Sequence, residues 1–110
     1  MVVSELVSRL GAEVLTGEHS TDAEVTGIYC GDLLSWVMSH AAKGSAWITV
    51  HTHLNIVAVA SLTELSCVII PENIEVDEPT IKKAISENVI IVRSELTTYQ
   101  ICCIANECGI

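Results

Sequence analysis

Apolar residues along this chain fall into two kinds of segment that follow one another: short uninterrupted runs and longer segments with helical spacing. The most informative stretch is residues 46–60, AWITVHTHLNIVAVA, where a short apolar run meets the polar triplet His51, Thr52 and His53 and then a second apolar segment. We interpret residues 46–50 as a buried strand that leads through a tight polar turn into a helix. Such a unit is half of a βαβ motif.

The same pattern, followed along the whole chain, predicts the element order α-β-β-α-β-α-β-α-β-α. Ser4, Asp32 and Thr52 are expected to cap the first three helices, and Thr97 forms a capping box with Gln100 for the last. Helices are expected over residues 3–10, 33–42, 52–65, 77–88 and 97–109, and strands over residues 12–16, 24–30, 46–50, 67–70 and 89–92. The buried stripe of the fourth helix is expected to consist of Ile81, Ala84 and Ile85.

Two of the expected strands, residues 67–70 (CVII) and 89–92 (VIIV), are apolar at every position. This pattern is typical of strands that are buried on both faces, as in a parallel sheet covered by helices. We therefore predict a three-layer α/β/α fold with a mainly parallel sheet, built by residues 1–110 as a single domain. The polar segment 17–23 is expected to be its most mobile loop.

The charge balance narrows the possible partners. The chain carries 14 acidic and 5 basic residues, which gives a net charge of −9. This argues against nucleic acid, whose phosphates need a surface of Lys and Arg, and against an anionic membrane surface. The apolar runs are too short to span a bilayer, and the N-terminal residues do not resemble a signal peptide, so we expect a cytoplasmic protein.

Several residue types invite a chemical interpretation that their spacing does not support. His51 and His53 could share a metal ion, but two ligands do not make a site, and we predict neither a metal nor a cofactor. The cysteine count is odd, 5, and no CxxC occurs, so disulfides are not expected and Cys30 and Cys67 are interpreted as small buried residues. The adjacent pair Cys102 and Cys103 fits helix packing better than an iron–sulfur cluster. No GxSxG nucleophile turn is present.

The predicted helices over residues 33–42 and 52–65 are apolar around most of their circumference. A helix that covers one face of a sheet needs an apolar stripe on that side alone. Something must therefore cover the outer sides, and a second copy of the chain is the simplest answer, so we predict a homodimer through these helices.

If the sheet is parallel, the helices that follow Gly31, His51, Glu72 and Ser94 begin at one edge of it. Helix N-termini carry partial positive charge and free N–H groups, so a small anion or a nucleotide phosphate could bind there without basic residues. The alternative is that local caps satisfy these groups. The candidate ligand-binding residues are Gly31, Asp32, His51, Thr52, His53, Asn55, Glu72, Asn73, Ser94 and Thr97.

Two segments resemble known families. Residues 2–35, beginning VVSELVSRLGAEVLTGEHS, are similar to the N-terminal, non-catalytic domain of HPr kinase/phosphorylase, and residues 47–104 match the order of DRTGG domains. The late region, residues 84–91, also fits that family's pattern. The signature letters differ, because His51-Thr52-His53 stands where those domains have Asp-Arg, and Pro71-Glu72-Asn73 stands where they have Thr-Gly-Gly.

The resemblance implies an α/β/α fold like that of the N-terminal domains of HPr kinase and Mur ligases, and a regulatory or ligand-sensing role, often in a dimer. Kinase activity is not expected of this chain, because it has no GxxxxGK(S/T) phosphate loop. We therefore expect a non-enzymatic regulatory module that senses a small ligand or docks on a protein partner. The alternative is an interaction subunit of a redox complex of the hydrogenase type, with no ligand of its own.

Overall fold

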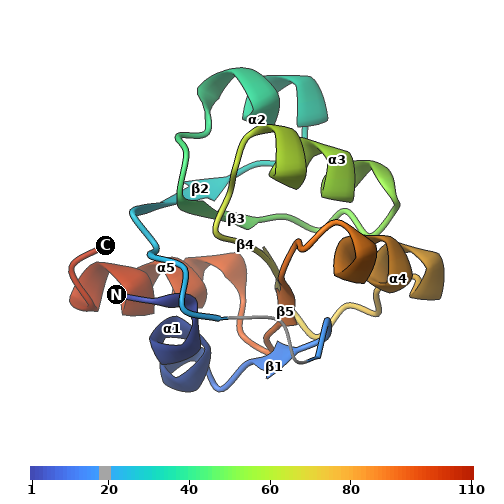
Figure 1. The fold of residues 1–110 in the computed structure, drawn as a ribbon. Coiled ribbons are helices and arrows are strands. Elements are labelled where there is room, and N and C mark those ends of the chain that lie inside the picture. Colours follow the sequence, from blue (N-terminus) through green and yellow to red (C-terminus); the bar gives the residue numbers. More distant parts are fainter. Residues whose placement is uncertain (18–20) are drawn as a thin grey trace.

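The computed structural model describes residues 1–17 and 21–110, so the middle of the loop predicted at residues 17–23 lies outside the described residues. Its elements follow the predicted order (Figure 1). The helices are α1 (Val3–Leu10), α2 (Leu34–His40), α3 (Asn55–Leu62), α4 (Glu78–Ser86) and α5 (Thr98–Glu107). The strands are β1 (Glu13–Val14), β2 (Gly27–Cys30), β3 (Ser45–Ile48), β4 (Cys67–Ile70) and β5 (Ile91–Arg93). None of these helices has the length and hydrophobicity that crossing a membrane requires.

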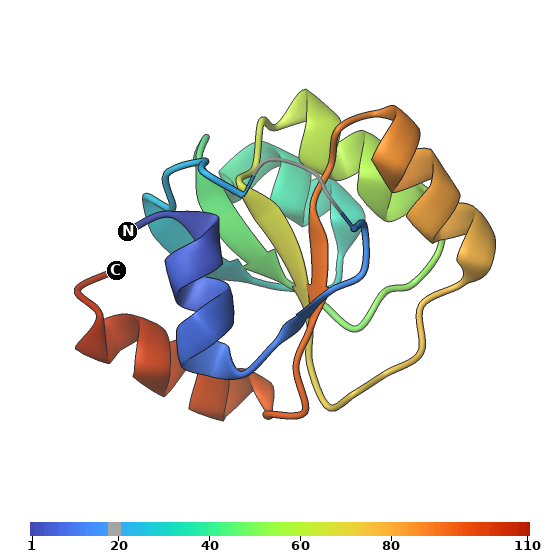
Figure 2. The same ribbon diagram turned by 60° about the horizontal axis from the view of Figure 1, so that its bottom comes forward.

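The strands form one sheet in the order β1-β5-β4-β3-β2. Neighbours from β2 to β5 are parallel, while β1 pairs antiparallel with β5 at one edge. Helices α2, α3 and α4 cover one face of the sheet, and α1 and α5 cover the other (Figure 1, Figure 2). The prediction of a three-layer α/β/α fold with a mainly parallel sheet is confirmed.

Successive residues of the central strands point to opposite faces of the sheet, and both sets are buried. Trp47 and Val68 pack with the layer that contains α2, α3 and α4. Ile48 and Ile69 pack with the layer that contains α1 and α5. Strands covered on both faces need apolar residues at every position, which explains the uninterrupted runs in the sequence.

Helix α3 is shorter than the predicted residues 52–65. It ends at Leu62 because Glu64 adopts a left-handed conformation with φ 55°, and the N–H of Leu65 donates to the carbonyl of Ala60 at 3.0 Å. These turns satisfy the last carbonyl groups of the helix. Helix α2 likewise ends at His40, two residues before the predicted end.

Strands β2 and β5 begin two or more residues later than predicted. Strand β2 starts at Gly27 because Glu24 forms an isolated antiparallel bridge with Val2 instead of joining β3. Strand β5 starts at Ile91 because the N–H of Val89 donates to a carbonyl of α4 at 2.9 Å and so closes that helix. In both places apolar residues of the sequence precede the first residue of the strand.

Three of the predicted helix caps are wrong. The side chains of Ser4, Asp32 and Thr52 cap no helix, since α1 begins after Val2, and α2 and α3 begin without a side-chain cap. The backbone N–H of Val2 instead bonds to the carboxylate of Glu5 at 3.2 Å. Asp32 and Thr52 make long-range hydrogen bonds that are described below.

The capping box at the start of α5 is confirmed. The Oγ1 atom of Thr97 accepts from the N–H of Gln100 at 3.2 Å, and the Oε1 atom of Gln100 accepts from the N–H of Thr97 at 3.0 Å. Both bonds join residues within one turn, so the local sequence is enough to specify them.

The buried face of α4 differs from the predicted stripe. Thr80 and Ala84 are fully buried and Ile81 is half-buried, but the side chain of Ile85 is 44% exposed. Residues four apart share a helix face, while Ile85 lies about 100° around the helix from Ala84. The buried position is occupied by a threonine, which a search for apolar spacing passes over.

The two cysteines predicted to be buried behave differently. Cys67 lies in the central strand β4 and is buried, as predicted. Cys30 is exposed, because β2 forms the outer edge of the sheet and has no strand beyond it. The prediction for Cys30 is therefore wrong.

Candidate functional site

The carboxyl ends of β2, β3, β4 and β5 lie at the same edge of the sheet. The parallel register pairs Cys30 with Ile48, Ile48 with Ile69, and Ile70 with Arg93, so the four strands end nearly level. The loops that follow them contain the candidate residues, which the topology therefore brings to one edge, as predicted. In open α/β sheets this edge is where ligands bind.

Asp32 joins the first two of these loops. Its Oδ1 atom accepts hydrogen bonds from Oγ1 of Thr49 at 2.8 Å and from the N–H of Val50 at 3.0 Å. The Oγ1 atom of Thr49 in turn accepts from the N–H of His51 at 3.2 Å, and Nε2 of His51 bonds to the backbone oxygen of Asp32. Asp32 is thus a positioning residue that ties the loop after β2 to the loop after β3.

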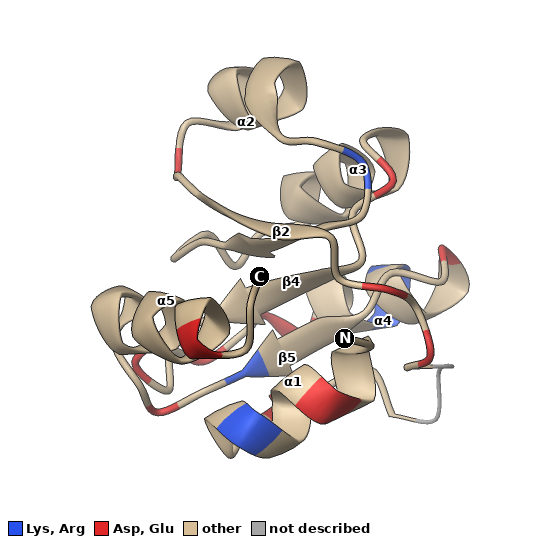
Figure 3. Cartoon of the chain, turned by 90° about the vertical axis from the view of Figure 1, so that its left-hand side faces the viewer, with Lys and Arg blue, Asp and Glu red and all other residues tan. Residues whose placement is uncertain are grey.

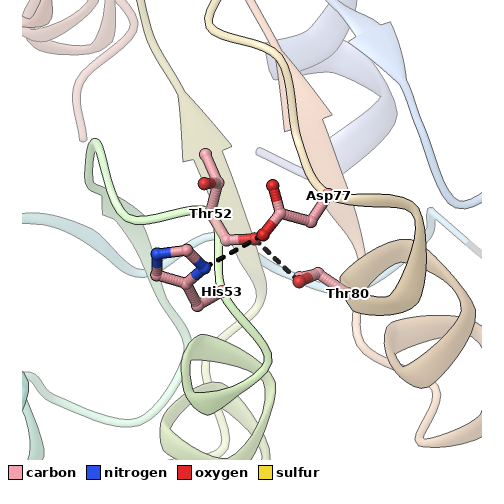
Figure 4. A network of polar contacts seen from close by, with 4 residues as sticks. All are labelled: Thr52, His53, Asp77 and Thr80. Atoms are coloured by element: carbon pink, nitrogen blue, oxygen red, sulfur yellow. Dashed lines mark hydrogen bonds and ion pairs between the residues drawn. The ribbon is translucent and has the colours of Figure 1, made fainter.

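The loop after β3 is also tied to the start of α4 (Figure 4). Oγ1 of the buried Thr80 donates to the backbone oxygen of Thr52 at 2.7 Å. Nδ1 of His53 lies 2.9 Å from Oδ2 of Asp77, but the two side chains are 73% and 46% exposed. An ion pair so exposed adds little stability, so Thr80 is the stronger anchor and His53 stays accessible.

The loops after β4 and β5 are joined through their backbones. Glu72 and Asn73 adopt left-handed conformations with φ 57° and 54°, and their N–H groups donate to the carbonyls of Leu96 and Ser94 at 2.9 and 2.8 Å. Ser94 is buried, and its hydroxyl accepts from the N–H of Leu96 at 3.1 Å. Thr97 is occupied in its capping box, so these loops use these groups internally, although α4, which follows β4, also begins without a side-chain cap.

The other half of the edge offers more groups to a ligand. Helices α2 and α3 begin without a side-chain cap, and the exposed Asn55 stands at the first position of α3. Gly31 and His51 are half-buried beside them. Within residues 1–17 and 21–110, no three His, Cys, Asp or Glu residues come together in a way that could hold a metal ion.

Three residues that hold this edge together were not predicted from the sequence, namely Thr49, Asp77 and Thr80. Thr49 falls inside the predicted strand and Asp77 was assigned only to a helix start. Thr80 lies in the first turn of α4. Its hydrogen-bond partner, Thr52, is 28 residues away in the sequence and could not be inferred from a local pattern. A polar residue within an apolar segment was the available signal for Thr49, while the polar surroundings of Thr80 gave none.

Helices α2 and α3 contain no Asp, Glu, Lys or Arg (Figure 3). Large apolar side chains are exposed on them and at their first turns. The exposed side chains are Leu33, Trp36, Met38, Leu54 and Leu62. A groove of about 420 Å³ between α3 and α4 adjoins them. It is lined by Leu54, Val57, Ala58, Ser61, Leu62, Lys83 and Glu87. This surface is separate from the polar network of the sheet edge.

Removing the Asp32 carboxylate is expected to destabilise the protein. Asp32→Ala leaves the buried hydroxyl of Thr49 without its acceptor, so the free energy of unfolding should fall by about 1–2 kcal/mol. Asp32→Asn keeps an acceptor oxygen and should cost less. Urea unfolding followed by circular dichroism measures both, and equal stability of Asp32→Ala and the wild type would contradict the assigned role.

Comparison with known proteins gives two findings and one absence. The family model described as the DRTGG domain matches residues 5–108. The fold is similar to that in a crystal structure of the CBS and DRTGG domains from the regulatory region of Clostridium perfringens pyrophosphatase, complexed with its activator, diadenosine tetraphosphate. The TM-score is 0.70 at 12% identity, and the match covers 93% of this chain but 44% of that one. No curated protein matches the sequence.

Proposed function

Because the chain belongs to the DRTGG domain family, we propose that it is a non-enzymatic regulatory module, a single domain over residues 1–110 that senses a small ligand in the cytoplasm. The observation that supports this most strongly is the fold it shares with a regulatory region that was crystallised with a nucleotide activator. That region is more than twice as long as the matched part, so the position of its ligand carries no argument here. The likeness to HPr kinase stays a prediction.

The proposed ligand is a small anion or nucleotide phosphate, bound at the carboxyl edge of the sheet beside Asp32, His51, His53 and Asn55. The uncapped start of α3 supports an anion there. The exposed side chains of His53 and Asn55 add hydrogen-bond donors. Binding of an anion by backbone N–H groups suits a chain with a net charge of −9, because the chain has only 5 Lys and Arg residues.

We further propose that the chain acts as a homodimer through the outer sides of α2 and α3. Leu33 and Leu62 are 66% and 72% exposed there, and Trp36 is 55% exposed. Several exposed large apolar side chains on two neighbouring helices favour a protein–protein interface. The absence of charged residues on both helices suits a surface that packs against a copy of itself.

Thermal unfolding in the presence of ATP, diadenosine tetraphosphate or inorganic phosphate tests ligand sensing. Ligand at a hundredfold excess over Kd stabilises the folded state by about 2.7 kcal/mol, so Tm should rise by about 10 °C. Asn55→Ala should reduce the shift. The matched control is Asn106→Ala, an exposed asparagine at the end of α5, which should leave it unchanged.

A second function, an interaction subunit of a larger redox complex, is supported by the same apolar outer sides of α2 and α3. It differs from the first in one measurable respect, because it needs no ligand. A Tm that stays constant across all three compounds at millimolar concentration would contradict ligand sensing of this class and favour the interaction subunit.

A further inference from the structure

Two cysteines that lie far apart in the sequence meet at the edge of the sheet. Cys30 is the last residue of β2, and Cys102 lies in the middle of α5, which packs against that strand. Their Sγ atoms are 3.4 Å apart, although 72 residues separate them. This contact is independent of the ligand proposed above.

The two sulfur atoms are close enough for a disulfide to form after a small movement. A disulfide bond is about 2.05 Å long, so the two sulfur atoms need to approach by little more than an ångström. Cys30 is exposed at the outer edge of the sheet, and Cys102 is half-buried, so a small oxidant can reach the pair. Cys67, by contrast, is buried in the central strand.

We propose that Cys30 and Cys102 form a reversible disulfide, which makes the contact between β2 and α5 a redox-sensitive clamp. The oxidant is a small-molecule disulfide such as oxidised glutathione. The thiolate of one of the two cysteines attacks it, and one glutathione leaves as a thiolate that takes up a proton. The thiol of the other cysteine then loses its proton and displaces the second glutathione, so two thiols are oxidised and one disulfide is reduced to two thiols.

The surroundings of Cys30 oppose the loss of its proton. Partial burial of the sulfur atom, the hydrogen bond to Cys102 and the nearby charges of Cys102 and Asp32 raise the pKa of Cys30 to about 12. A protonated thiol is a poor nucleophile, so oxidation of the pair should be slow at neutral pH.

The clamp would act on the ligand edge through the chain itself. Cys30 is followed directly by Gly31 and Asp32, the start of the loop that Asp32 ties to Thr49 and Val50. A covalent bond to α5 fixes the beginning of this loop against the opposite layer of the fold. The loop after β2 would then be less mobile in the oxidised protein than in the reduced protein.

The test treats the reduced full chain with oxidised glutathione and measures intact mass, a peptide map without reductant, and Tm. The expected product has lost the mass of two hydrogens, links Cys30 to Cys102, and unfolds about 5–15 °C higher until dithiothreitol reverses the change. Cys30→Ser and Cys102→Ser should each abolish the link, and Cys103→Ser, the matched neighbour on α5, should retain it.

Three results would overturn the proposal. The first is a product that carries glutathione without an internal link. The second is a link through Cys103 or Cys108 in place of Cys102. The third is a link between Cys30 and Cys102 that leaves Tm unchanged, because an unstrained disulfide between residues 72 apart restricts the unfolded chain and should raise the temperature of unfolding.

Discussion

Replacing Trp47 by alanine is expected to lower the free energy of unfolding by about 3–5 kcal/mol, which is much of the stability of a small domain. Trp47 lies in β3, next to the central strand, and is fully buried between the sheet and the helices that cover it. Its Nε1 atom donates to the carbonyl of Gly31 at 2.8 Å. The substitution therefore removes a large apolar volume and also the bond that holds the loop after β2.

The matched control for this prediction is Trp36→Ala. Trp36 is the other tryptophan of the chain, and its side chain is 55% exposed on α2. Its removal should change the stability of the fold itself by less than about 1 kcal/mol. Urea unfolding by circular dichroism at low protein concentration compares the two variants. A similar fall in the free energy of unfolding in both variants would contradict the assignment of Trp47 to the core.

The second large effect is expected at the proposed dimer interface. Trp36→Glu places a charge on the outer side of α2, where the indole stacks on the ring of His40 with centroids 3.9 Å apart. Changes of a central aromatic residue in an interface commonly cost 2 kcal/mol or more, so the dimer Kd should rise by roughly 30-fold or more. Sedimentation velocity over a range of protein concentrations measures this as conversion of dimer to monomer.

Tyr99→Glu serves as the control for the interface. Tyr99 is 78% exposed, more than Trp36, but it lies on α5 in the opposite layer of the fold. The substitution should leave the dimer intact. A wild-type protein that sediments as a monomer at every concentration, or a dimer that only Tyr99→Glu disrupts, would rule out the interface on α2 and α3.

The features that could be predicted from the sequence are those that local physics specifies. Strand β4 was predicted with its exact bounds, Cys67–Ile70, because burial on both faces demands an apolar residue at each position. The capping box of Thr97 and Gln100 was predicted because both bonds lie within one helical turn. The strict alternation of strands and helices then left a parallel sheet as the fitting arrangement.

The features that were missed depend on contacts between distant segments. Asp32 looks like a helix cap, but its carboxylate accepts hydrogen bonds from Thr49 and Val50 instead. Thr52 also looks like a cap, but its backbone oxygen accepts from Thr80 in the first turn of α4. Nothing in the local pattern distinguishes a capping residue from one that bonds to a distant segment.

The same reason explains why the exposure of Cys30 and its contact with Cys102 were not foreseen. Both depend on β2 being the outer strand of the sheet, and the order of strands is not written in the local pattern. The candidate residues of the site, in contrast, follow from parallel strands alone, whatever their order. The gathering of these residues at one edge of the sheet could therefore be predicted, while the hydrogen bonds between the loops could not.

The central claim is that the carboxyl edge of the sheet binds a small anionic ligand, and amide chemical shifts of isotope-labelled protein titrated with diadenosine tetraphosphate or ATP test it most directly. The account predicts saturable shifts that are largest in the loops after β2 and β3, at Gly31, Asp32, His51, Thr52, His53 and Asn55. A titration without shifts, or with shifts confined to the opposite ends of the strands, would contradict it.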